Sequence, residues 1–116
     1  MGSEVSAMRT MAYRKLVRDR IPEIIEASGK RCSCEILTED RYLDMLDRKL
    51  EEELAEYQES KSMEELADLL EVIRAVASAR GSSIGEIEMI RAQKEKARGG
   101  FAKRILLTGV IEPGKE

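Results

Sequence analysis

The chain of 116 residues contains no histidine. This absence excludes Ser-His-Asp and Cys-His catalysis in their usual forms, and it excludes the Glu-x-x-His ligands of di-iron bundles. Any catalytic chemistry must therefore use carboxylates, cations, hydroxyls or a bound metal. The only cysteines, Cys32 and Cys34, are spaced awkwardly for a mutual disulfide and are too few for a zinc site without histidine. We expect both to be small, buried or half-buried residues of an extended segment.

Aromatic residues are also scarce: they make up 3% of the chain, tryptophan is absent, and there are only two prolines. This composition argues against a β-sandwich or a barrel, whereas the plentiful Leu, Ile, Val and Met argue against disorder. The sequence therefore predicts one small all-α domain, an antiparallel helical hairpin bundle of about four helices. In so short a chain, we expect self-association to complete the core.

Long apolar runs are missing as well. No stretch approaches the roughly 18 apolar residues that a membrane span requires, and residues 1–12 lack the hydrophobic segment of a secretory signal. We therefore expect a cytoplasmic protein that does not bind membranes. Residues 1–12 are predicted to form a flexible leader, residues 13–107 the folded domain, and residues 108–116 a tail.

The first helix is expected within residues 16–30. Asp19 is predicted to cap it, Pro22 lies in its first turn, and Gly29 ends it. The weak alternation of residues 32–37 indicates an extended connector or a short strand.

Three further helices follow from hydrophobic spacing and capping residues. A long helix begins near Thr38. Ser62 opens a Ser-x-x-Glu capping box, so a second long helix starts there and ends at Gly81. Residues 82–98 form the last predicted helix, which is followed by a short helix or strand and then the tail. The two long helices, joined by a tight turn, form an antiparallel hairpin.

Charge is unevenly distributed along the chain, whose net charge is −3. Residues 39–71 carry thirteen acids against four bases, whereas residues 1–31 have a net charge of +3 and residues 91–104 one of +5. An acidic centre between two basic segments suits a polyanion held through metal ions. The alternative is ordinary charge pairing between neighbouring helices.

The first long helix turns selected acids toward its apolar stripe. Relative to Leu50 in this stripe, Glu53 lies about 60° away and Glu56 about 120° away on the same flank. Glu52 and Glu59 lie roughly opposite the stripe, and we expect both to be solvated.

The second long helix places Glu65 inside its apolar arc, between Val72 and Val76 in angle, and Asp68 at the edge of that arc. Burial of a carboxylate among aliphatic side chains is unfavourable unless it is paired, protonated or bound to a cation. Converging carboxylates repel without counter-charge, which a hard divalent cation such as Mg²⁺ supplies through oxygen ligands. The alternative is that these acids pair with Lys or Arg of other helices.

A basic row continues the apolar stripe of the last helix. Arg91, Lys94 and Arg98 share one helix face with Ile84 and Ile87. Such a row suggests an anionic partner that is partly enclosed. Cations that merely extend from a helix edge into water are the alternative.

Residues 49–56 read KLEEELAE and residues 64–68 read EELAD, so the chain contains EExxE followed by ExxD. This pair of motifs resembles the signature of the superfamily of MazG-like all-α nucleoside triphosphate pyrophosphohydrolases. YRKLVRDRIPEII at residues 13–25 and RGGFAKRI at residues 98–105 resemble the flanks of its small subfamily related to phosphoribosyl-ATP pyrophosphohydrolase. The blocks stand in the right order.

This resemblance implies Mg²⁺ ligands at Glu53, Glu56, Glu65 and Asp68, the four acids that the helical angles also select, with Mn²⁺ as an alternative metal. It implies hydrolysis of an ordinary or a damaged nucleoside triphosphate between its α- and β-phosphates, as a house-cleaning reaction in the second case. The products would be the monophosphate and pyrophosphate. Glu53 or Glu56 would act as the general base.

The basic phosphate contacts that the resemblance implies are Lys15, Arg18, Lys94 and Arg98. A homodimer or a dimer of dimers is also implied, and the short spacer between the two acidic motifs suggests that a second chain helps to assemble the pocket. Phosphoribosyl-ATP hydrolysis and a non-catalytic dimerisation or regulatory module stay open as alternatives. The scarcity of aromatics for base stacking argues against nucleic-acid binding.

Overall fold

The computed structural model describes residues 14–114, so the expected leader at residues 1–12 lies outside the described part of the chain. Residues 14–114 are all-α, as predicted, and contain four helices and no strand. The helices are α2 (Ile21–Ala27), α3 (Glu39–Ser60), α4 (Met63–Ala79) and α5 (Ile84–Arg98).

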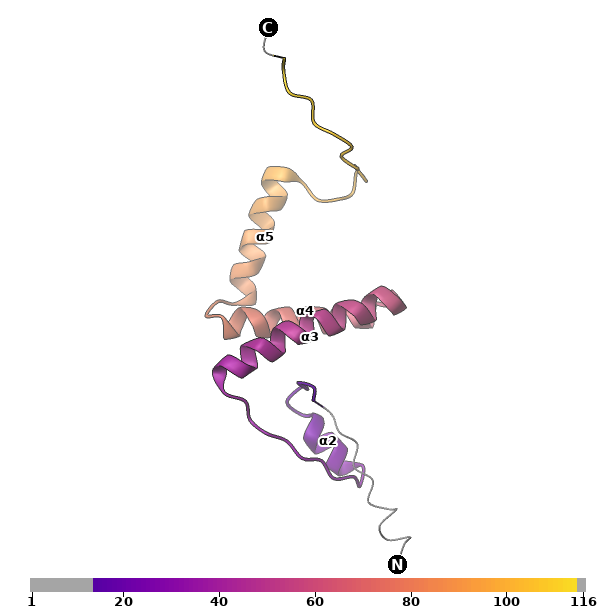
Figure 1. The fold of residues 1–116 in the computed structure, drawn as a ribbon, viewed down its shortest axis with the longest axis vertical. Helices are drawn as coiled ribbons and strands as arrows, with labels where there is room; N and C mark the ends of the chain where they lie inside the picture. Colours follow the sequence, from indigo (N-terminus) through magenta and orange to yellow (C-terminus); the bar gives the residue numbers. More distant parts are fainter. Residues whose placement is uncertain (1–13, 115–116) are drawn as a thin grey trace, which may run out of the picture.

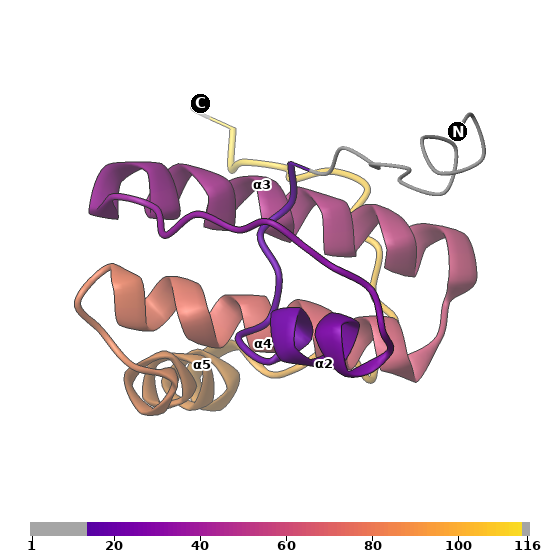
Figure 2. The ribbon, with the colours of Figure 1, turned by 90° about the horizontal axis from the view of Figure 1, so that it is seen from below.

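Helices α3 and α4 form the predicted antiparallel hairpin and lie side by side along their length (Figures 1 and 2). Thr38 caps α3 as expected, because its side chain accepts a hydrogen bond from the Arg41 amide. The turn between the helices consists of Lys61, in the left-handed region with φ 57°, and Ser62. The Ser62 hydroxyl accepts a hydrogen bond of 3.3 Å from the Glu65 amide, which confirms the predicted cap of α4.

The buried core of the hairpin is small. Only Leu46, Val72 and Ala77 are buried apolar residues within the described chain, and the carboxylate of Glu53 is buried with them. At the end away from the turn, Arg80 forms a 2.9 Å ion pair with Asp47 and thereby links the two helices. Burial therefore stabilises the contact between α3 and α4 but covers little of either helix.

Among the described helices, α5 packs chiefly against α4 and then leads away from the hairpin (Figure 1). Its start follows Gly81, whose φ of 83° is in the region that favours glycine, and Ser83 caps it by accepting a hydrogen bond from the Glu86 amide. The principal extents of the molecule, 89 × 30 × 27 Å, reflect this open arrangement.

Helix α2 makes no helix–helix contact with the other described helices. Pro22 stands in its first turn as predicted, but Asp19 as its cap is wrong: the cap position is Arg20, and no side chain caps the helix. Pro22 lacks an N–H group and so removes one of the donors that a capping carboxylate would use. Instead, Arg20 pairs with Glu23.

The connectors contain no regular structure. Residues 30–38 form neither helix nor strand, and their thiols are free, with Cys32 half-buried and Cys34 exposed. Residues 104–114 also lack a helix or strand, whereas a short helix or strand was expected after the last long helix. None of the helices in residues 14–114 has both the length and the apolar character needed to cross a membrane.

The Ser62 cap can be tested by substitution. We expect Ser62→Ala to lower the free energy of unfolding by about 1 kcal/mol, because the first turn of α4 loses its side-chain acceptor. Urea denaturation measures this change, and Ser78→Ala, at an exposed position of the same helix, is the matched control. Equal stability of the two variants would contradict a capping role for Ser62.

Candidate metal centre

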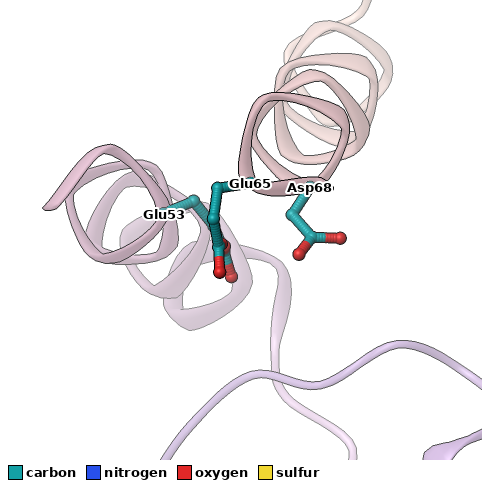
Figure 3. Close-up of side chains that lie close together, drawn as sticks. All are labelled: Glu53, Glu65 and Asp68. Atoms are coloured by element: carbon teal, nitrogen blue, oxygen red, sulfur yellow. The ribbon is translucent and has the colours of Figure 1, made fainter. Parts of the chain in front are cut away.

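Three acids from the two long helices meet near the hairpin turn. Glu53 extends from α3, and Glu65 and Asp68 extend from the first turns of α4 (Figure 3). One carboxylate oxygen of each lies within 4.8 Å of the other two. The two-residue turn produces this convergence, because it places the start of α4 directly beside the second half of α3.

The three carboxylates are not all open to water. Glu53 is 6% exposed, and Glu65 and Asp68 are half-buried. Within the described chain, Oε2 of Glu53 and Oε2 of Glu65 are buried and accept no hydrogen bond. A buried acceptor without a partner costs about 1–3 kcal/mol, and more if it is charged. The fold therefore tolerates an unfavourable arrangement at this place.

A hard divalent cation fits this set of groups. All three donors are carboxylate oxygens, the ligand type that Mg²⁺ and Mn²⁺ prefer, and neither nitrogen nor sulfur ligands stand among them. Ligand distances of about 2.0–2.6 Å would place two oxygens of one cation up to about 4–5 Å apart. The observed spacing is close to that span, and a cation would satisfy the two unpartnered oxygens.

Glu56, the fourth predicted ligand, is half-buried one turn beyond Glu53 and is not one of the three converging acids. It nevertheless acts on the site. Burial is the main cause that raises the pKa of Glu53 above its usual value, and the neighbouring carboxyl of Glu56 raises it further. Lys49 opposes both effects, because its positive charge favours the ionised form of Glu53.

Lys49 is a site residue that the helical pattern did not single out. Its Nζ lies 3.4 Å from Glu53 and 3.2 Å from Glu52. The available signal was its spacing, three and four residues before these acids on one helix. The expectation that Glu52 is solvated was wrong, since Glu52 is half-buried and also lies 3.4 Å from Lys15. The angular position of a residue on its own helix does not reveal whether another segment of the chain packs over that residue.

The N-terminal segment brings two predicted phosphate contacts to the acids. Lys15 pairs with Glu52, and Arg18 forms a 2.8 Å ion pair with Asp68. Lys94 and Arg98 are exposed on α5, which leads away from the hairpin (Figure 1). Within one described chain, the structure therefore does not bring these two cations to the acidic cluster.

Comparisons with known proteins give one partial relative. An uncharacterised protein of Mycolicibacterium smegmatis is 55% identical over 42 residues, which cover 36% of this chain and 43% of that protein. The chain thus spans less than half of the relative's length. No protein-family model and no solved structure matches the chain. The case for a function therefore rests on the residues of the site.

The raised pKa of Glu53 predicts a pH-dependent stability. The Glu53 carboxyl binds its proton more tightly in the folded chain than in the unfolded chain. Its ionised form therefore destabilises the fold, and this destabilisation is fully present above the folded-state pKa of Glu53. The destabilisation fades as the pH falls toward the ordinary pKa of Glu. Without divalent metal, Glu53→Gln should remove this dependence and raise the melting temperature at pH 7 by about 4 °C, which corresponds to about 1 kcal/mol.

Thermal denaturation between pH 5 and pH 8 measures this effect. Glu51→Gln, at an exposed position of α3, removes the same charge and should follow the wild-type curve. A Glu53→Gln variant that melts below the wild type at pH 7 would show that the buried carboxylate stabilises the fold, contrary to our interpretation.

The Arg18–Asp68 pair predicts competition with a metal. Both partners are partly exposed, and such pairs are worth about 0–1 kcal/mol, so a cation can displace the guanidinium. Without nucleotide, Arg18→Gln should tighten Mn²⁺ binding by up to about fivefold, as followed by electron paramagnetic resonance. Arg20→Gln, whose parent residue pairs with Glu23, is the control. Weaker Mn²⁺ binding in Arg18→Gln would mean that Arg18 supports the site.

Proposed function

We propose that this chain is a Mg²⁺-dependent nucleoside triphosphate pyrophosphohydrolase that releases pyrophosphate and a nucleoside monophosphate. The observation that carries this proposal is that Oε2 of Glu53 and Oε2 of Glu65, beside Asp68, are buried and accept no hydrogen bond from residues 14–114. These acids stand at the positions where the sequence resembles the metal-binding motifs of MazG-like enzymes. The triphosphate has the anionic oxygens that a carboxylate-held cation would bind.

The acids of the site would have two different roles, as metal ligands and as general base. Glu53, Glu65 and Asp68 would hold the cation, with Mn²⁺ as an alternative to Mg²⁺. When bound, the metal would neutralise charge on the triphosphate oxygens and lower the pKa of the attacking water. Because the three carboxylates come from two helices locked by a tight turn, their positions would change little during the reaction.

Glu56 is the better candidate for the general base. It lies beside Glu53 but outside the group of three converging acids, so its carboxylate is free of the coordination that this group would provide. A carboxylate that is not used in coordination can take the proton of a water directed at the α-phosphorus. In this assignment, Glu53 serves as ligand and Glu56 as base.

Cations would hold the phosphate charge that the metal leaves. Lys15 and Arg18 already contact acids at the rim of the site and could turn to a bound triphosphate. Lys94 and Arg98 could contribute only if a second chain brought its α5 to this hairpin, which supports a homodimer or a dimer of dimers.

The decisive experiment compares three variants in the presence of Mg²⁺. Glu53→Gln should lose both the metal-induced rise in melting temperature and most hydrolysis, because a neutral amide binds Mg²⁺ weakly. Glu56→Gln should keep the thermal shift but lose activity by about 100-fold or more, as expected for a missing general base. Glu51→Gln, the exposed control on α3, should keep both.

Product analysis completes this test. A panel of ordinary and damaged nucleoside triphosphates should yield monophosphate and pyrophosphate, and diphosphate with phosphate would mean attack at the γ-phosphorus. A melting temperature that does not change in millimolar Mg²⁺ or Mn²⁺ would refute the metal site. A folded protein that binds metal but hydrolyses no triphosphate would favour a non-catalytic regulatory module.

A further inference from the structure

The C-terminal part of the described chain is an apolar arm without a partner. We define this arm as residues 105–111, ILLTGVI, which run beyond α5 away from the hairpin (Figure 1). Its five large aliphatic side chains are 75–97% exposed: Ile105, Leu106, Leu107, Val110 and Ile111. Single exposed apolar residues are ordinary, but five within seven residues indicate a surface that is covered in the working protein.

A matching apolar groove lies where α3, α4 and α5 meet. It has a volume of about 230 Å³, and its walls include Leu50 of α3, Ile73 and Val76 of α4, and Ile87 of α5. In the described chain the arm runs away from α3 and α4, which supply most of these walls (Figure 1). Each chain therefore carries both an apolar arm and an apolar groove, and within residues 14–114 the arm does not occupy the groove.

The chain exposes more surface than a compact monomer of its mass. A folded chain of 13.1 kDa is expected to expose about 6,400 Å², whereas this chain exposes 11045 Å². The excess is about 4,600 Å² per chain. Obligate homodimers bury about 2,000–5,000 Å² in total, which is about 1,000–2,500 Å² per chain, so one such interface would cover a substantial part of it.

We propose that the arm of each chain docks into the groove of a second copy of this chain, so that two chains exchange their arms. A two-fold axis turns one arm–groove contact into two identical contacts and closes the assembly. Folding the arm back onto its own groove would cover those two surfaces alone. It would leave exposed Leu66 and Leu70 on α4 and Met89 on α5, which a second copy can also cover.

The arm itself suggests which side docks. In an extended segment, successive side chains point to opposite sides. Ile105, Leu107 and Ile111 then share one side, interrupted only by a glycine, whereas Thr108 lies on the other side. The purely aliphatic side suits the aliphatic walls of the groove.

Site-directed cross-linking separates exchange from folding back. In a Cys32→Ser, Cys34→Ser background, one chain would carry Leu107→Cys and a second, tagged chain Ile87→Cys. The two are mixed under mild denaturation, refolded together and oxidised. We expect a covalent heterodimer on a non-reducing gel. A chain that carries both substitutions and closes only on itself, migrating as a monomer, would overturn the proposal.

Sedimentation provides the second test. The wild-type chain at micromolar concentration should sediment as a dimer or a larger even-numbered oligomer, and Leu107→Asp should shift the population to monomer. Thr108→Asp, which adds the same charge to the arm at the neighbouring position, should remain associated. Dimers that survive Leu107→Asp, or a monomeric wild type, would refute arm exchange. The Mg²⁺-induced thermal shift of Leu107→Asp reports separately on the metal site, so the two proposals can fail independently.

Discussion

The two-residue turn between α3 and α4 is the constraint on which the site depends. Lys61 takes a left-handed conformation and Ser62 caps the next helix, so the chain reverses with almost no freedom in length or angle. This reversal sets Glu53 opposite Glu65 and Asp68. A longer, flexible turn would let the helices slide, and the carboxylates could then relieve their repulsion by separating.

The acids around the turn are only partly neutralised by neighbouring cations. Lys15 and Arg18 neutralise acids at the rim, where ion pairs are weak and exchangeable. Oε2 of Glu53 and Oε2 of Glu65 accept no hydrogen bond within the described chain. In this pattern the outer charges are paired, whereas the buried carboxylate oxygens lower the stability of the fold because they lack a hydrogen-bond partner in the described chain.

The open shape of the molecule has its origin in the small core. With three buried apolar residues, the hairpin cannot enclose a pocket by itself, and much aliphatic surface of α4, α5 and the arm stays exposed. Surface of this extent is what an obligate partner chain would cover. Helix α5, which carries Lys94 and Arg98, likewise leads away from the hairpin and its acids (Figure 1).

The sequence by itself determined the helices, the hairpin and the inward acids, because hydrophobic spacing, capping residues and helical angles are local properties of the chain. Thr38 and Ser62 are caps as predicted, and three of the four predicted ligands converge. Only the tertiary structure decided the pairing of Glu52 with Lys15 and of Arg18 with Asp68, the separate position of Glu56, and the path of α5 away from the acids. These depend on which segments pass over one another, and long-range placement of that kind leaves no periodic signal in a single sequence.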